Sequence, residues 1–271
     1  MAMIDPSSVR SAPLRFDIVT IFPGMFNGPF ETGIVARARD RGAIAIGVHD
    51  LRDWTGDRHR SVDDTPYGGG AGMVMTAPPI VAAVEGIAGP ELATSRVVVL
   101  AASGRPFTQA VANALARESR IVLVCGRYEG IDDRAGLALG ADELSIGDYV
   151  LTGGELAAMV VVDAVTRLLP GVINAASTVA ESHEGGLVEH PHYTRPETFR
   201  EFPVPPVLLG GNHGEIARWR RREAIRRTAE RRPDLLPKAA LTTEERAWAE
   251  RAAGDQAVDG ERTMSAAALE P

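Results

Sequence analysis

The sequence lacks several features, and each absence excludes a class of protein. A single cysteine, Cys125, excludes an internal disulfide and indicates a reducing compartment. No uninterrupted apolar run reaches about 18 residues, so we expect no membrane span. The N-terminal segment has Asp5, Pro6 and Pro13 where an export signal needs an apolar stretch. We therefore expect a cytoplasmic protein.

Several motifs that carry chemistry are also absent. No G-x-G-x-x-G fingerprint follows a predicted strand, and there is no G-x-x-x-x-G-K-[ST] phosphate loop. The glycine-rich segment 67–73 lies in a long polar loop with no lysine after it, which disfavours nucleotide hydrolysis. The histidines show no metal-ligand spacing, and no G-x-S-x-G elbow presents a serine nucleophile. Cys125 ends an apolar strand and is interpreted as a packed side chain.

The negative charge of the chain is unevenly distributed. The net charge of −7 alone argues against nucleic acid, yet residues 218–232 contain eight arginines against two glutamates. The last 31 residues hold seven acidic and three basic side chains. A solvated helix normally mixes Lys and Glu, whereas an excess of arginine around most of a helix fits phosphate binding better. Residues 218–232 therefore predict contact with a polyanion.

Apolar strands alternate with helices through the first 170 residues. We expect strands at 14–21, 43–49, 96–101, 121–125 and 143–146, and helices at 30–41, 78–86, 108–117, 131–139 and 154–169. Uniformly apolar strands are typical of an α/β fold whose mostly parallel sheet is covered on both faces. Ligands bind beyond the carboxyl ends of such strands. Three glycine-bearing loops lie there, at 101–104, 126–130 and 145–154.

The domain organisation follows from changes in this pattern. We expect a catalytic domain at 1–170, an interdomain linker at 171–196, a small helical and basic domain at 197–251, and a disordered tail at 252–271. The loop at 50–76 is longer than a connection requires. The stretch 145–167 is the most informative, because its glycines let the backbone wrap closely around a small planar ligand.

Five segments resemble, in the same order, the TrmD family of bacterial tRNA (guanine-N1)-methyltransferases. They are residues 64–70 (DTPYGGG), 126–132 (GRYEGID), 145–155 (SIGDYVLTGGE), 191–196 (PHYTRP) and 204–208 (VPPVL). The resemblance implies a SPOUT-class fold with a deep C-terminal trefoil knot, which strand patterning alone would not suggest because threaded backbones are rare. It also implies S-adenosylmethionine as the methyl donor, a homodimer with active sites at the interface, and a requirement for Mg²⁺.

The substrate that the resemblance implies is the guanine at tRNA position 37, on the 3′ side of the anticodon, methylated on N1. N1 must lose its proton, and negative charge then grows on O6, so the reaction needs a base and a cation. By match to the family, Arg167 is the cation. The family's base is a linker aspartate, whose position here holds Glu181, one methylene longer; His183 is the alternative base. Ala71 and Ala157 replace the family's usual prolines.

The resemblance also implies which residues bind the donor and the RNA. The donor would contact Leu100, Ala101, Gly104, Gly126, Tyr128, Glu129, Gly130, Ser145, Ile146, Gly147, Tyr149, Leu151, Gly153 and Gly154. Asp63 and Gly72 would read a neighbouring base, and the anticodon stem-loop would be held by Arg218, Arg221, Arg222 and Arg226. Two alternatives are an RNA-binding sensor of S-adenosylmethionine and a ribose 2′-O-methyltransferase.

Overall fold

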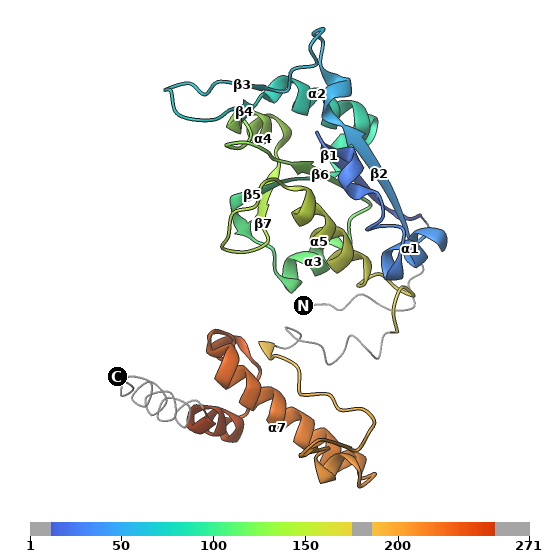
Figure 1. The fold of residues 1–271 in the computed structure, drawn as a ribbon, viewed down its shortest axis with the longest axis vertical. Helices are drawn as coiled ribbons and strands as arrows, with labels where there is room; N and C mark the ends of the chain where they lie inside the picture. Colours follow the sequence, from blue (N-terminus) through green and yellow to red (C-terminus); the bar gives the residue numbers. More distant parts are fainter. Residues whose placement is uncertain (1–11, 175–185, 253–271) are drawn as a thin grey trace. The chain divides into compact units, whose positions relative to one another are not determined.

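The computed structural model describes residues 12–174 and 186–252, which belong to two compact units, Met1–Ala175 and Ala176–Pro271 (Figure 1). The first unit is an α/β structure built on one five-stranded sheet. The strands are β1 (Leu14–Thr20), β2 (Ile44–Asp50), β5 (Arg96–Pro106), β6 (Arg120–Cys125) and β7 (Asp142–Ser145), in the order β2-β1-β6-β5-β7. Every pairing in this sheet is parallel, which confirms the predicted α/β class with a mostly parallel sheet.

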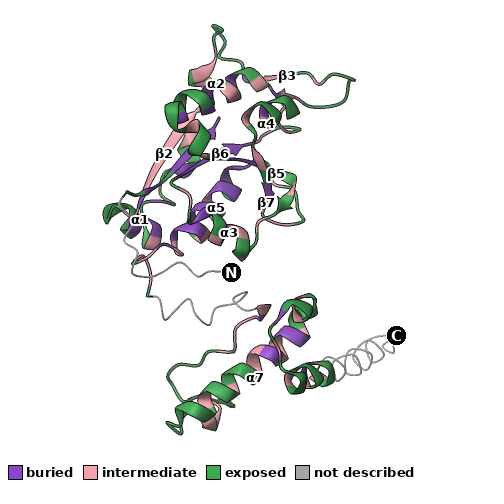
Figure 2. Cartoon of the chain, turned by 180° about the vertical axis from the view of Figure 1, so that it is seen from behind, coloured by how far each residue is buried: buried purple, intermediate pink, exposed green. Residues whose placement is uncertain are grey.

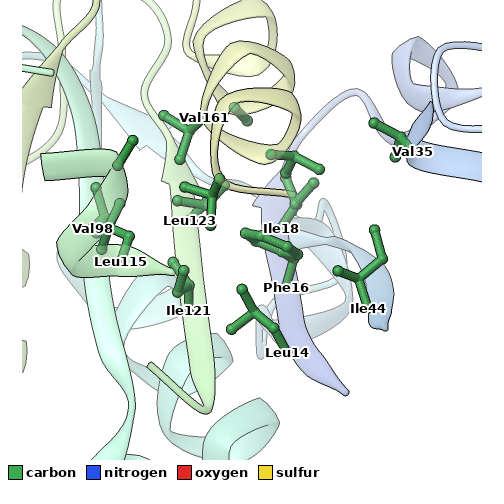
Figure 3. Packing of buried hydrophobic residues seen from close by; sticks show 14 of the residues in the cluster. Leu14, Phe16, Ile18, Val35, Ile44, Val98, Leu115, Ile121, Leu123 and Val161 are labelled. Carbon is green, nitrogen blue, oxygen red and sulfur yellow. The ribbon is translucent and has the colours of Figure 1, made fainter. Parts of the chain in front are cut away.

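Helices cover both faces of the sheet, which explains why its strands are apolar throughout (Figure 2). On one face, Phe16, Ile18 and Leu123 pack against α1 (Gly33–Asp40), α3 (Gln109–Leu115) and α5 (Glu155–Thr166). Figure 3 shows this cluster, with side chains of β1 and β6 gathered beside α5. On the other face, Val97 and Val122 pack against α2 (Ala77–Ala88) and α4 (Asp133–Leu139).

Local sequence signals set the ends of these helices. Two prolines lie in the first turn of α2, where their missing N–H groups cost nothing, and the helix ends at Gly89 with a φ of 55°. The Asp132 carboxylate caps α4 by accepting from the backbone N–H of Arg134. Gly140 ends α4 in the left-handed region at φ 58°. The side chain of Thr108 caps α3 by accepting from the backbone N–H of Val111.

Strand β5 is interrupted by a bulge that the sequence did not reveal. Leu100 pairs with Leu144 of β7, and Arg105 then pairs with the same residue, so residues 101–104 leave the ladder and return. A Cβ on Gly104 would lie 2.6 Å from the backbone nitrogen of Leu144, so only glycine allows this close approach. The strand predicted at 96–101 therefore continues to Pro106.

A fully buried carboxylate lies in the middle of β1. Asp17 accepts hydrogen bonds from Arg120 Nε at 2.8 Å and Arg15 Nε at 2.9 Å, and its Oδ1 lies 2.8 Å from His49 Nε2. Arg120 also donates to the carbonyl of Ile87 at the end of α2. Burial by itself raises the pKa of Asp17, but the hydrogen bonds outweigh it, so that pKa lies below its ordinary value.

The long loop at 50–76 contains its own short elements. It begins with η2 (Leu51–Trp54) and contains the antiparallel pair β3 (Asp63–Asp64) and β4 (Val74–Met75). Met75 is fully buried, and its N–H and C=O are hydrogen-bonded to Gly130 and Asp132, respectively. The base of the loop is thereby fixed to the segment that follows β6. The remaining short helices of this unit are η1 (Pro23–Phe26) and η3 (Gly89–Thr94).

The second unit centres on α7 (His213–Arg231). The side chain of Asn212 caps this helix by accepting from the N–H of Glu215. Before it lie a hairpin of β8 (Thr198–Phe199) and β9 (Phe202–Pro203) and the turn η5 (Pro206–Leu208). After it come η6 (Pro233–Lys238) and a helical segment at 243–252. The expectation of helix from residue 197 onward is wrong for 198–203, which form a short hairpin that includes Pro203.

The core of this unit is small, with Leu187, Ile225, Ala239 and Ala249 buried together. Residues 186–196 were expected in the linker, but they pack against α7 of the second unit. The N–H of Val188 donates to Thr228 Oγ1 at 2.9 Å, and the ring of Tyr193 lies 6.2 Å from that of Trp219. Within the described ranges of both units, no helix is long and apolar enough to cross a membrane.

Candidate functional site

A cavity of about 420 Å³ opens at the bulge of β5 and at the carboxyl ends of β6 and β7. This volume lies within the range of about 300–1,000 Å³ typical of small-molecule sites. Its walls are the three glycine-bearing loops that the sequence placed at strand ends. Every predicted donor residue except Gly104 lines it: Leu100, Ala101, Gly126, Tyr128, Glu129, Gly130, Ser145, Ile146, Gly147, Tyr149, Leu151, Gly153 and Gly154.

Gly104 has a different place from the one predicted. It does not line the cavity but lies against the backbone of β7, where it lets β5 rejoin the sheet. Its contribution to the site is indirect, because the bulge at 101–104 carries Ala101, Ala102 and Ser103, which do line the cavity. Neither Ala102 nor Ser103 was predicted; both lie inside the 101–104 loop that the sequence singled out.

The loop after β6 forms one wall of the cavity. Tyr128 adopts a left-handed φ of 59° and is half exposed, which directs the backbone around the opening. The N–H of Glu129 donates to the carbonyl of Met73 at 3.0 Å. A Cβ on Gly72 would lie 2.4 Å from Glu129 Oε1, so Gly72 and Glu129 are in close contact. The structure thus brings a predicted RNA-reading residue beside a predicted donor residue. Asp63 lies on β3, at the base of the same long loop.

The loop after β7 forms the facing wall. Ser145 Oγ accepts from the N–H of Gly147 at 3.3 Å, and Gly147 has a φ of 154°. The Tyr149 ring lies against Gly147, where a Cβ would be 2.5 Å from it. The N–H of Gly154 donates to the carbonyl of Gly126 at 2.9 Å, so this wall is hydrogen-bonded to the first one.

Two titratable groups here have shifted pKa values: Asp132, which lines the cavity, and Cys125, which directly precedes the loop that does. Burial raises the pKa of the Cys125 thiol well above its ordinary value, so it stays neutral, in agreement with a packed rather than nucleophilic cysteine. Hydrogen bonds from Arg134 lower the pKa of Asp132 to about 2, so this cavity-lining carboxylate is charged at neutral pH. Among the described residues, no three His, Cys, Asp or Glu side chains gather as a metal site.

The predicted catalytic residues are only partly described. Arg167 is half-buried and caps the C-terminus of α5, where its N–H donates to the carbonyl of Asp163 at 3.2 Å. Glu181 and His183 lie outside the described residues. The structure therefore neither brings the predicted cation and base together nor separates them.

The four predicted RNA-contacting arginines fall into two pairs. Arg221 donates to Glu245 at 2.8 Å, and Arg226 donates to Glu223 at 2.7 Å and also to Glu230. These hydrogen bonds raise the pKa of both guanidinium groups. Arg218 and Arg222 are exposed and have no hydrogen-bond or ion-pair partner in the described part of the chain. Of the four, these two therefore have guanidinium groups that no acidic side chain of the described residues neutralises.

The similarity to known proteins extends across both units. The sequence pattern of the family described as "tRNA (Guanine-1)-methyltransferase TrmD" matches residues 14–238. The chain belongs to this family. A tRNA (guanine-N(1)-)-methyltransferase of Thermomicrobium roseum is 59% identical over 229 residues, which are 84% of this chain and 85% of that protein. Proteins of the same name from Chloroflexus aggregans and Dehalococcoides mccartyi are 58% and 50% identical, over 84% and 86% of this chain and 89% and 94% of their own lengths.

The TrmD match contains both the cavity loops and α7, which the structure places in different units. The relatives match over 229 and 227 residues, more than the first unit contains, so the similarity does not rest on the cavity alone.

Proposed function

We propose that this chain transfers the methyl group of S-adenosylmethionine to N1 of the guanine at tRNA position 37. The observation that carries the proposal is the cavity, because all but one of the donor residues implied by the TrmD family line it together. Its glycine-rich walls suit a ligand that the backbone approaches closely. When bound, the sulfonium supplies an electrophilic methyl group.

The protein's part in the reaction is to remove a proton and stabilise charge. Glu181 accepts the N1 proton, and the guanidinium of Arg167 stabilises the charge that develops on guanine O6. His183 is the alternative base. The glutamate extends one methylene further than the family's aspartate, and an error of about 1 Å in position can cost on the order of 10²-fold in rate. The reach of the linker therefore matters as much as the chemistry of its carboxylate.

The RNA is held by a second set of contacts. Arg218 and Arg222, exposed on α7, contact phosphates of the anticodon stem-loop, with a smaller contribution from Arg221 and Arg226 because those two are ion-paired. Asp63 and Gly72 read the base beside the target. The contact between Gly72 and Glu129 supports this assignment, because it places the long loop at the cavity.

The active molecule is proposed to be a homodimer with its sites at the interface. Leu156 and Val160, one turn apart on α5, are 49% and 44% exposed, and Val150 in the cavity loop is 87% exposed. Such uncovered apolar side chains beside a site are typical of a surface that a partner covers. A second copy of this chain is the proposed partner.

The finer features of the fold are proposals of the same kind. A trefoil knot is supported by the path of the chain, which runs from β7 at the sheet edge back to Gly154, beside Cys125 in the interior. The SPOUT class follows from that knot. The domain limits at 170, 196 and 251, and the cytoplasmic location, remain predictions. No group of carboxylates that would hold Mg²⁺ occurs in the described ranges, so no step is assigned to a metal.

Methyl transfer to defined transcripts tests the proposal. The purified chain is incubated with labelled S-adenosylmethionine and tRNA transcripts that carry guanine or adenine at position 37, and the product nucleoside is identified by mass spectrometry. We expect N1-methylguanosine from the guanine transcript alone. A 2′-O-methylated product would favour the ribose reading, and donor binding without any transfer would favour a sensor.

A further inference from the structure

Glu155 is a buried carboxylate that none of the proposed steps uses. It is 1% exposed and is the first residue of α5. A buried charge is costly unless it is paired and hydrogen-bonded. Glu155 has both kinds of partner: Thr20 Oγ1 donates to its Oε1 at 2.8 Å, and Arg127 Nε donates to its Oε2 at 3.0 Å. The N-terminus of α5 also stabilises its negative charge.

These three side chains come from three separate segments. Thr20 ends β1, Arg127 lies in the loop after β6, and Glu155 follows the loop after β7. Thr20 Oγ1 also accepts from the N–H of Phe22 at 2.9 Å, and the guanidinium of Arg127 lies 4.5 Å from the centre of the Phe22 ring. Glu155 is therefore the common acceptor that joins the end of β1 to both facing walls of the cavity.

Gly153 and Gly154, at the end of the loop after β7, leave room for the Arg127–Glu155 pair and for the close approach of β6. A Cβ on Gly153 would lie 2.2 Å from Arg127 Nε, and a Cβ on Gly154 would lie 2.8 Å from the Cα of Cys125. Arg127 and Gly153 also form an isolated antiparallel bridge. The side-chain ion pair thus reinforces the place where the two walls already share backbone hydrogen bonds.

We propose that Thr20, Arg127 and Glu155 are positioning residues that hold the two cavity walls at the spacing that S-adenosylmethionine requires. Arg127 lines the cavity, whereas Thr20 and Glu155 do not and act through it. The identity of the ligand rests on the proposed function; the positioning role rests on the contacts themselves.

The test compares two Glu→Gln changes that each remove the negative charge from a carboxylate that accepts from an arginine. Glu155→Gln is the test variant. Glu91→Gln is the control for loss of an arginine-paired carboxylate away from the cavity, since Glu91 accepts from Arg120 Nη1 at 2.9 Å, and its side chain is more exposed than that of Glu155. Thr20→Val is a milder second variant that leaves the Arg127–Glu155 pair in place and removes the hydrogen bonds of Thr20 Oγ1 to Glu155 and to the N–H of Phe22. The Kd for S-adenosylmethionine is measured by calorimetry, and KM is measured separately for donor and tRNA.

Glu155→Gln is expected to raise the Kd and the KM for the donor about tenfold, the scale of one charge-assisted hydrogen bond. The KM for tRNA is expected to stay within about twofold, and Thr20→Val to show a smaller change of the same kind. Combining Arg127→Gln with Glu155→Gln is expected to add little to either single change, because both break one network. An unchanged donor Kd in Glu155→Gln, or an equal loss in Glu91→Gln, would overturn the proposal.

Hydrogen–deuterium exchange of the ligand-free protein separates this proposal from the proposed function. Faster exchange of residues 126–130 and 146–154 in Glu155→Gln, but not in Glu91→Gln, supports the positioning role even if the wild-type chain binds no S-adenosylmethionine. If the wild-type chain binds no donor but this difference in exchange is seen, the proposed function is wrong and the positioning role is supported. Unchanged exchange in those segments overturns the network, whatever the donor does.

Discussion

The two units of this chain use charged side chains in opposite ways. In the first unit, Asp17 and Glu155 are buried and each accepts from an arginine that fixes a neighbouring segment. In the second unit, Arg221 and Arg226 of α7 pair with glutamates, Arg227 donates to the carbonyl of Glu189, and others such as Arg218 face solvent. The first arrangement joins neighbouring backbone segments inside the unit, whereas the second leaves arginines at the surface, where we propose that they contact tRNA. The first is therefore expected to respond more strongly to substitution, and the second to salt.

The largest expected effect comes from the proposed base, Glu181, which lies outside the described residues. Glu181→Gln should slow methyl transfer by about 10²–10⁴-fold, because an amide cannot accept the N1 proton. His183→Ala in parallel identifies the alternative base. Single-turnover rates over a range of pH report the chemical step directly. A normal rate for Glu181→Gln with a slow rate for His183→Ala would reassign the base.

Arg167→Ala should lower kcat by about 10²–10³-fold, since it removes a donor to charge that develops in the transition state. The Kd for S-adenosylmethionine should not change, because Arg167 does not line the cavity. Steady-state kinetics together with calorimetry separate the two quantities. A weakened donor Kd with an unchanged kcat would mean that Arg167 supports the fold or the cavity instead.

The buried network of the first unit can be compared with an ion pair of the second. Asp17→Asn should reduce the free energy of unfolding by about 3–5 kcal/mol, because the buried Arg120 loses its only buried charged partner in the described part of the chain and keeps the exposed Glu91. Glu245→Gln, which breaks the partly exposed pair with Arg221, should cost no more than about 1 kcal/mol. Urea unfolding measures both. Equal losses would contradict the contrast between the two units.

Acid should affect the Asp17 network with a defined sign. The pKa of Asp17 is below its ordinary value in the folded chain, so its contribution to stability is complete above the ordinary carboxyl pKa. That contribution is lost as the pH falls through the lower folded value. Unfolding followed between neutral pH and about pH 2 should show a smaller acid-induced loss in Asp17→Asn than in the wild type. Parallel losses would exclude this role.

The smallest expected effects are those of single α7 arginines on the salt dependence of tRNA binding. Raising the salt concentration should weaken tRNA binding far more than donor binding, because phosphate contacts release counterions. Arg218→Ala and Arg222→Ala should each reduce the salt slope by about one, and Arg221→Ala by less, because Glu245 already holds its guanidinium. Filter binding at several salt concentrations checks this. The same slope for tRNA and donor would contradict the assignment of α7.

Much of the first unit could be predicted because its strands are buried on both faces. Residues such as Val97 and Val122 make the strands recognisable without any contact information, and glycines after them mark the loops that meet at the cavity. The role of Gly104 could not be predicted, because it depends on the backbone of β7, which lies about 40 residues later in the chain. A register shift of this kind leaves no periodic signal.

Contacts between side chains that are distant in the sequence could not be predicted either. Asp17 reads as one polar residue in an apolar strand, and only the fold brings Arg120 to it from 103 positions away. The eight arginines of 218–232 look equivalent in the sequence, whereas Glu245 selects Arg221 from 24 positions away. The hairpin at 198–203 was missed because each of its strands has only two residues, too short for a period to be visible.

The most direct test of the account is the location of the methyl donor in crystals of this chain grown with S-adenosylmethionine. We predict that the donor occupies the cavity between the loops after β6 and β7, in contact with Tyr128 and Gly153. Donor bound at any other place on the chain, with this cavity empty, would contradict the account.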